Sequence, residues 1–113
     1  MRVMSFAPTQ ELAPFVRAFT VVEADEETTR LLIPDGGIVL GFRYRGHATL
    51  LNGGPPTRLP DATLAGLHHT ARQMRTSAGG GIVLATFHQA GAARFFPEPL
   101  HELFGRTAAL DEL

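Results

Sequence analysis

Cysteine and lysine are both absent from this chain, and each absence removes a class of chemistry. There is no cysteine, which excludes disulfides, thiolate nucleophiles and cysteine-ligated zinc. All ten basic residues are arginine, so a lysine Schiff base, a P-loop lysine and a lysine general base are excluded as well. A chain without disulfides is compatible with a reducing compartment such as the cytosol.

Long apolar runs are also missing. No stretch approaches the roughly 18–20 apolar residues that a membrane helix needs. The first residues, MRVMSFAPTQEL, contain no continuous apolar core, so no signal peptide is predicted. The formal net charge of −1 gives no reason to expect nucleic acid or an anionic membrane as a direct partner. We therefore expect a cytoplasmic protein without a membrane partner.

The residues that are present predict one domain, residues 1–113, built mainly from short strands. The length and the apolar content of 44% are ordinary for a single globular domain. Stretches rich in valine, isoleucine, phenylalanine and threonine alternate with glycine and proline. Strands are predicted at residues 15–24, 30–33, 38–44, 47–51, 62–69, 71–77 and 82–88.

Short helices are predicted near the two ends of the chain. Pro8 and Pro14 bound one helical turn, because the residue before a proline is pushed out of helical space. Toward the C-terminus, helical spacing and good helix formers predict segments at 90–95, 99–104 and from Thr107 onward. Short strands followed by short helices are typical of a mainly β, α+β domain. We expect a small barrel or sandwich over about 1–89 and helices over 90–113.

The stretch LLIPDGGIVLGFRY, residues 31–44, has two possible interpretations: a phosphate-binding loop or a turn between two strands. A P-loop requires a lysine, and a dinucleotide loop opens a helix. Here the β-branched, alternating sequence IVLGF follows the glycines and predicts a strand. Gly36 and Gly37 are therefore interpreted as a tight turn between strands.

Five histidines are the only candidates for a transition-metal site. His68 and His69 are adjacent, so on a strand they point to opposite faces and only one of them could join His88. No carboxylate lies between Asp61 and Glu98 to supply a third ligand. We expect no metal, and we interpret these histidines as strand-end residues bonded to backbone or water. A His68–His88 metal site is the alternative.

Binding of a small anion is the other candidate chemistry. Arg43 lies opposite the apolar face of its strand, and Arg45, Arg72 and Arg75 are further candidates. An arginine inside a barrel mouth would hold a carboxylate or phosphate through two hydrogen bonds, whereas a solvated arginine has no such role. Gly66 would leave room for a ligand or mark a bend. Tyr44 would supply a pocket hydroxyl or pack with its polar tip in water.

Catalysis has little support in the sequence. Neither serine lies in a nucleophile motif, and the acidic run from Glu23 to Glu27 is interpreted as a solvated turn. We therefore do not expect an enzyme, and we expect no cofactor.

Four segments together resemble the N-terminal domain of AraC-type transcriptional regulators. They are FAPTQELAPFVRAFTVVE, RLLIPDGGIVLGF, LAGLH and GGGIVLATFHQAGAARFFPEPLHELFGRTAALDEL. They are similar to the family's F-x-P-x-x-x-L opening, its L-P-D-G turn, its glycine-bounded strand exit and its P-x-x-E-L helix. The resemblance runs in order along nearly the whole chain.

The resemblance implies a small cupin-like β-barrel, or jelly roll, that senses a small-molecule effector or forms a homodimer. It also implies that DNA is bound only through a C-terminal helix-turn-helix domain, which is absent from this chain. The expected ligand-binding residues are Arg43, Tyr44, Gly66, His68 and His88. The expected dimer or interdomain residues are Phe96, Leu100, Leu103 and Phe104. The alternatives are a small cupin-like metal-dependent enzyme and a stand-alone interaction domain.

Overall fold

The computed structural model describes residues 1–32, 37–51, 54–66, 71–88, 90–94, 96 and 106–112. Within these residues the chain is mainly β-structure, as the alternating pattern predicted. The strands are β1 (Arg2–Phe6), β2 (Val16–Ala24), β3 (Thr28–Leu32), β4 (Ile38–Arg45), β5 (Ala48–Leu51), β6 (Thr57–Arg58), β7 (Ala62–Ala65), β8 (Arg72–Thr76), β9 (Gly80–Phe87) and β10 (Thr107–Ala109). The helical elements are single 3₁₀ turns, η1 (Ala92–Arg94) and η3 (Leu110–Glu112).

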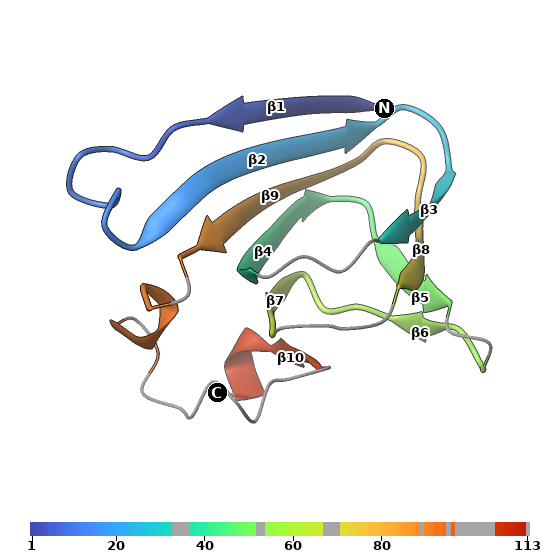
Figure 1. The fold of residues 1–113 in the computed structure, drawn as a ribbon. Coiled ribbons are helices and arrows are strands. Elements are labelled where there is room, and N and C mark those ends of the chain that lie inside the picture. The colour runs from blue at the N-terminus through green and yellow to red at the C-terminus, as the bar shows by residue number, and fades with distance from the viewer. Residues whose placement is uncertain are drawn as a thin grey trace.

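The strands form two antiparallel sheets. The larger sheet has the order β1-β2-β9-β4-β7-β10, and the smaller has the order β3-β8-β5-β6. Figure 1 shows β1, β2 and β9 side by side along the top, with the smaller sheet at the right. Among the described residues no strand pairs with both sheets, so these strands make two sheets and no closed barrel.

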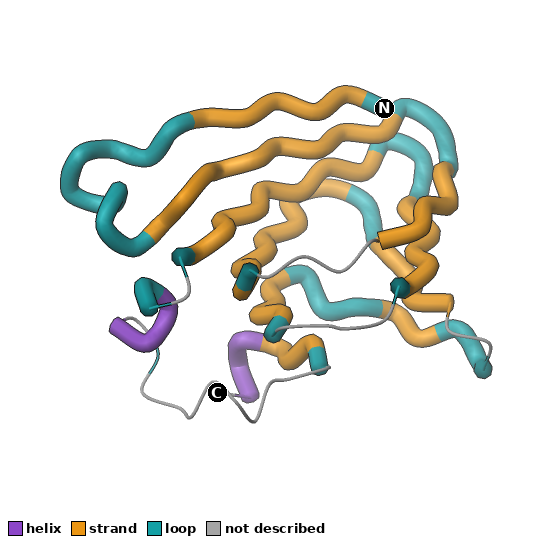
Figure 2. The backbone as a smooth tube through the Cα atoms, in the orientation of Figure 1, coloured by secondary structure: helices purple, strands orange, loops and turns teal. Residues whose placement is uncertain are grey.

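The link between β3 and β4 differs from the predicted tight turn between neighbouring strands. The strand after the glycines is confirmed as β4, which pairs with β7 and β9. However, β3 pairs with β8 in the other sheet. β3 and β4 therefore lie in different sheets and are not the two arms of one hairpin; Figure 2 shows the strands in the orientation of Figure 1. Residues 33–36, which contain the predicted turn, lie outside the described residues.

The tightest core lies on one face of the larger sheet, at the end where β4 begins. Leu64 of β7 pairs with Leu40 of β4 and with Ala108 of β10, so aliphatic side chains meet across three strands. The turn between β1 and β2 covers part of this face, since its Leu12 and Phe15 pack against the core cluster. Hydrogen bonds from the amides of Leu12 and Ala13 to the Thr9 carbonyl hold the turn. The buried members of the cluster are Val16, Ile38, Leu64, Ala85, Phe87, Ala92 and Ala108.

The prediction of C-terminal helices is wrong in part. Residues from Thr107 onward were expected to be helical, but Thr107–Ala109 form β10 on the edge of β7. Alanine is the best helix former, but propensity is worth less than about 1 kcal/mol per residue, and burial of Ala108 and Ala109 against the core outweighs it. The helix at 90–95 is reduced to the turn η1. The helix at 99–104 falls outside the described residues. The strand β1 was not predicted at all.

One glycine is required by the turn between β4 and β5. Gly46 has a φ of +74°, a conformation that side chains with a Cβ rarely adopt. A Cβ there would also lie 2.6 Å from Ser77 Oγ, the atom that accepts a hydrogen bond from the His47 amide. In the described part of the chain, no helix has the length and apolar character needed to cross a membrane.

Candidate functional site

A cavity of about 300 Å³ lies between the two sheets. Its walls come from the inner faces of both sheets and are mostly apolar. The larger aliphatic side chains in the wall are Val39, Leu50, Leu59, Met74, Ile82 and Leu84. A mostly apolar hollow with a few polar groups is the usual form of a small-molecule site.

Small residues on the facing strands account for the empty space. Gly41 of β4 lies beside Thr63 of β7, and a Cβ on this glycine would be 3.2 Å from Thr63 Oγ1. Ala65 and Gly66 continue the same wall, and Ala48 lines the opposite sheet. These short residues leave part of the gap between the larger aliphatic side chains unfilled.

Three arginines bring positive charge to this cavity. Arg30 of β3, Arg43 of β4 and Arg72 of β8 all line it, and no carboxylate occurs among its described lining residues. Arg72 is held by Thr107 of β10, to whose Oγ1 its Nη1 donates a hydrogen bond of 3.4 Å. The cavity therefore carries excess positive charge in partly dry surroundings.

Arg43 is the least compensated of these arginines. Its Nη1 atom is buried and has no hydrogen-bond partner. Burial lowers the pKa of Arg43 below the ordinary value; the nearby Asp61 opposes this effect and Arg30 adds to it. An unpartnered donor on a partly buried cation is an unfavourable arrangement unless something else supplies an acceptor.

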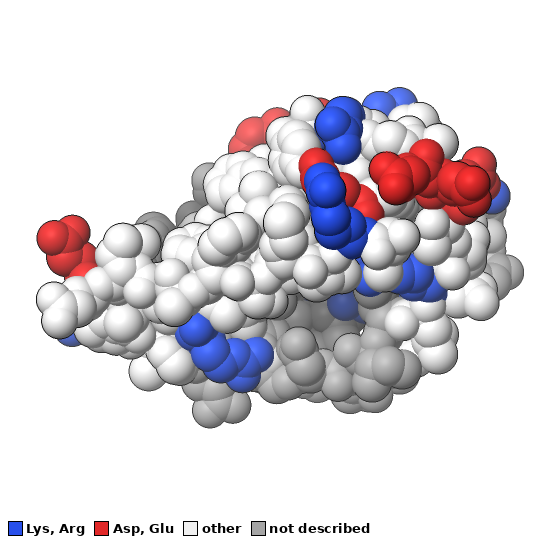
Figure 3. Space-filling view, turned by 90° about the horizontal axis from the view of Figure 1, so that it is seen from above, with Lys and Arg blue, Asp and Glu red and all other residues white. Residues whose placement is uncertain are grey.

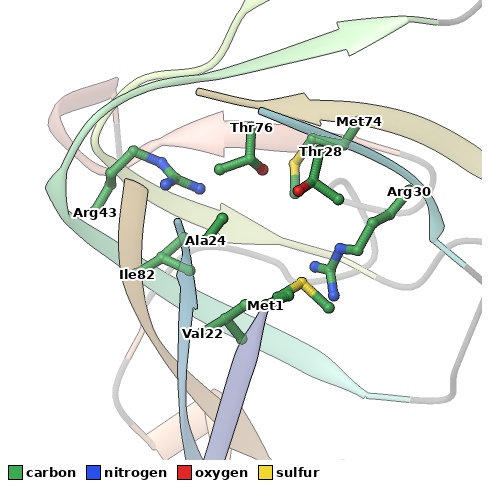
Figure 4. Close-up of a pocket in the computed structure, with 9 residues that line it drawn as sticks. All are labelled: Met1, Val22, Ala24, Thr28, Arg30, Arg43, Met74, Thr76 and Ile82. Carbon is green, nitrogen blue, oxygen red and sulfur yellow. The ribbon is translucent and has the colours of Figure 1, made fainter. Parts of the chain in front are cut away.

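Arg30 and Arg43 also line a second, much smaller pocket of about 10 Å³. Figure 4 shows the two guanidinium groups pointing into this space from opposite sides, that of Arg43 toward Thr76 and that of Arg30 toward Met1. A space of this size holds about one water molecule. The two arginines line both spaces, so they lie where the small pocket and the large cavity adjoin.

The structure places the predicted ligand residues in different parts of the molecule. Arg43 and Gly66 line the cavity. Tyr44 is exposed and lies on the opposite face of the sheet, against Gly81. His88 is exposed at the end of β9, where its amide donates to the Phe15 carbonyl. His68 lies outside the described residues.

The predicted interface residues are only partly visible. Phe96 is half-buried, and its ring meets the edge of Phe87 at 6.0 Å between centroids, so it packs on the core. Leu100, Leu103 and Phe104 fall outside the described residues. For the alternative metal site, no group of three or more histidine or acidic side chains placed to hold a metal ion occurs among the described residues.

Tyr44 takes part in a polar cluster on the outer face of the larger sheet. A register shift between Arg43 and Arg45 marks a β-bulge, and Tyr44 and Arg45 both reach Glu23 of β2. Tyr44 Oη donates to Glu23 Oε2 at 2.7 Å, Arg45 Nη2 lies 3.2 Å from the same oxygen, and Arg2 binds the other oxygen. Figure 3 shows basic and acidic side chains in contact on the molecular surface.

The pKa of Tyr44 is expected to report on this cluster. The hydrogen bond to Glu23 raises the pKa of Tyr44 above its ordinary value, and burial and the charge of Glu23 add to it. We expect Glu23→Ala to bring the pKa of Tyr44 back toward about 10, and Glu23→Gln, which keeps an acceptor without the charge, to give an intermediate value. Absorbance of the phenolate measures this directly, because the chain has one tyrosine and no tryptophan. An unchanged pKa in Glu23→Ala would contradict the assignment.

The fold and the cavity together define a small two-sheet β domain with a basic internal pocket. Over residues 4–109 the chain matches DUF6597, a domain of unknown function, and it therefore belongs to this family. A search of curated proteins and a search of solved structures each found no match.

Proposed function

We propose that this chain is the regulatory domain of an AraC-type transcription regulator and that it senses a small molecule in the cavity between its sheets. The open cavity of about 300 Å³ carries this proposal. A filled interior would instead favour a domain that only dimerises or acts as a scaffold. The cupin-like character, the cytoplasmic location and the absence of enzymatic activity are part of the same proposal.

The position of β10 suggests how a bound ligand would act on the rest of a regulator. Thr107 of β10 lines the cavity and accepts the hydrogen bond from Arg72. β10 leads directly into η3, whose Leu110 packs against the core cluster. A ligand that contacts Arg72 or Thr107 changes the relative stability of positions available to this C-terminal segment. Such a population shift would pass the signal to an attached DNA-binding domain.

The first test is the reading frame of the natural gene beyond the codon for Leu113. We expect about 100 further residues, rich in arginine and helices, with two helix-turn-helix patterns. The full product is then expected to bind DNA upstream of its own gene, measured by a shift in electrophoretic mobility. A stop codon at this point, or a following domain of another class, would contradict the regulator proposal.

A further inference from the structure

We propose that the cavity takes an organic anion whose acid group is held by Arg43 and Arg30 and whose apolar body lies along the aliphatic walls. This inference rests on the proposed sensing function and names the chemical class of the ligand. The observation behind it is that Arg30 and Arg43 both line a mostly apolar cavity with no carboxylate among its described lining residues.

The charges in the cavity select an anion. Arg30 and Arg43 both line the large cavity, and in the described residues neither forms a salt bridge. Arg30 also lowers the pKa of Arg43, as expected of a second cation in the lining of the same cavity. An acid group between them would relieve the repulsion and give the orphaned Nη1 of Arg43 an acceptor. The planar guanidinium fork suits the two oxygens of a carboxylate.

The walls select an apolar body of limited size. Away from the arginines, the cavity is lined by Val39, Leu50, Leu59 and Leu84. A cavity of about 150 Å³ holds a benzene molecule, so about 300 Å³ corresponds to a ligand of roughly 12 non-hydrogen atoms. A free inorganic anion would leave most of this volume empty, and a sugar would place hydroxyl groups against aliphatic walls. A medium-chain or arylalkyl carboxylate fits both parts of the site.

The experiment compares acids with neutral molecules of the same shape. Decanoate and phenylbutyrate are titrated into the protein by calorimetry, alongside decanamide and phenylbutyramide, and inorganic phosphate is titrated alone. We expect at least one acid to bind roughly 10- to 100-fold more tightly than its amide, the ratio expected of a charge-assisted hydrogen bond. Phosphate alone is expected to bind no more than weakly.

Two variants locate the acid group. In Arg43→Met, we expect the affinities for the acid and for its amide to differ by no more than about threefold. In Arg30→Met, we expect the ratio of the two affinities to fall only in part. Arg17→Met removes an exposed arginine outside the cavity and serves as the matched control, with the ratio unchanged. An unchanged ratio in Arg43→Met would overturn the placement of the acid group.

The outcomes separate this inference from the proposed function. Equal binding of acid and amide by the wild-type protein would overturn the anion inference and leave sensing intact. Tight binding of phosphate alone would contradict the inference that the ligand has an apolar body. If neither acids nor amides bind, both the ligand class and the sensing function are contradicted.

Discussion

Replacing Leu64 with alanine is expected to lower the free energy of unfolding by about 3–5 kcal/mol. Leu64 has an exposed fraction of 0%, and its strand lies between β4 and β10. The pairing strands hold Leu40 and Ala108 in fixed register around it. They cannot collapse into the space that the truncated side chain leaves, so the loss of apolar burial is joined by the cost of a new cavity.

Leu84 provides the matched comparison for this prediction. It is half-buried and faces the existing cavity from β9, so Leu84→Ala enlarges a hollow that the protein already contains. We expect the free energy of unfolding to fall by only about 1–2 kcal/mol, because the variant loses the burial of the removed methyl groups but creates little new cavity. Urea denaturation followed by circular dichroism measures both variants. Equal losses would mean that the space beside Leu84 is packed and not hollow.

The difference between these two leucines shows what the sequence could and could not predict about the fold. Alternation along residues 38–44 correctly predicted a strand with Ile38 and Leu40 on one face and Arg43 on the other. Alternation does not say which face meets a second sheet, because strand pairing is decided by residues far apart in the sequence. Here the face of Arg43 turns toward the smaller sheet and lines the interior.

Two strands that were not predicted, β1 and β10, have little in their own sequence that indicates a strand. β1 is mostly exposed and contains arginine and serine, so it has no apolar face of its own, and it exists because β2 offers it a pairing edge. β10 has one residue that favours strands, threonine, and two alanines, which are depleted in strands. Both strands are edges of the larger sheet, and both depend on a neighbour already in place.

Only part of the candidate site was predicted, because the sequence does not show which face of a strand is turned toward the other sheet. Arg43, Arg72 and Gly66 were named from the sequence as candidates, but Arg30 was not. On β3, Thr28 and Arg30 share one face while Leu31 lies on the other, which reads as a solvated polar face. The structure shows the opposite, since Leu31 is 58% exposed and Arg30 is half-buried at the cavity. The alternation along β3 was visible in the sequence, but which of its faces is turned inward is visible only in the structure.

Arg43→Met is expected to raise the free energy of unfolding of the ligand-free protein by about 1–2 kcal/mol. The substitution removes a buried donor that has no acceptor and a charge that faces Arg30. It keeps an unbranched chain of similar length, so the packing of the arginine stem is largely preserved. For a domain of this size each kcal/mol corresponds to a shift in the thermal midpoint of about 4–8 °C.

The measurement is thermal unfolding of wild type, Arg43→Met and the surface control Arg17→Met, with ligand absent. Arg17 is exposed, so its replacement is expected to change stability by no more than about 0.5 kcal/mol. A loss of stability in Arg43→Met would show that the guanidinium already has a compensating partner, and the argument for an anion at this position would fail. A gain would show that the domain retains a destabilising cation, which is the expected cost of a site built to bind an anion.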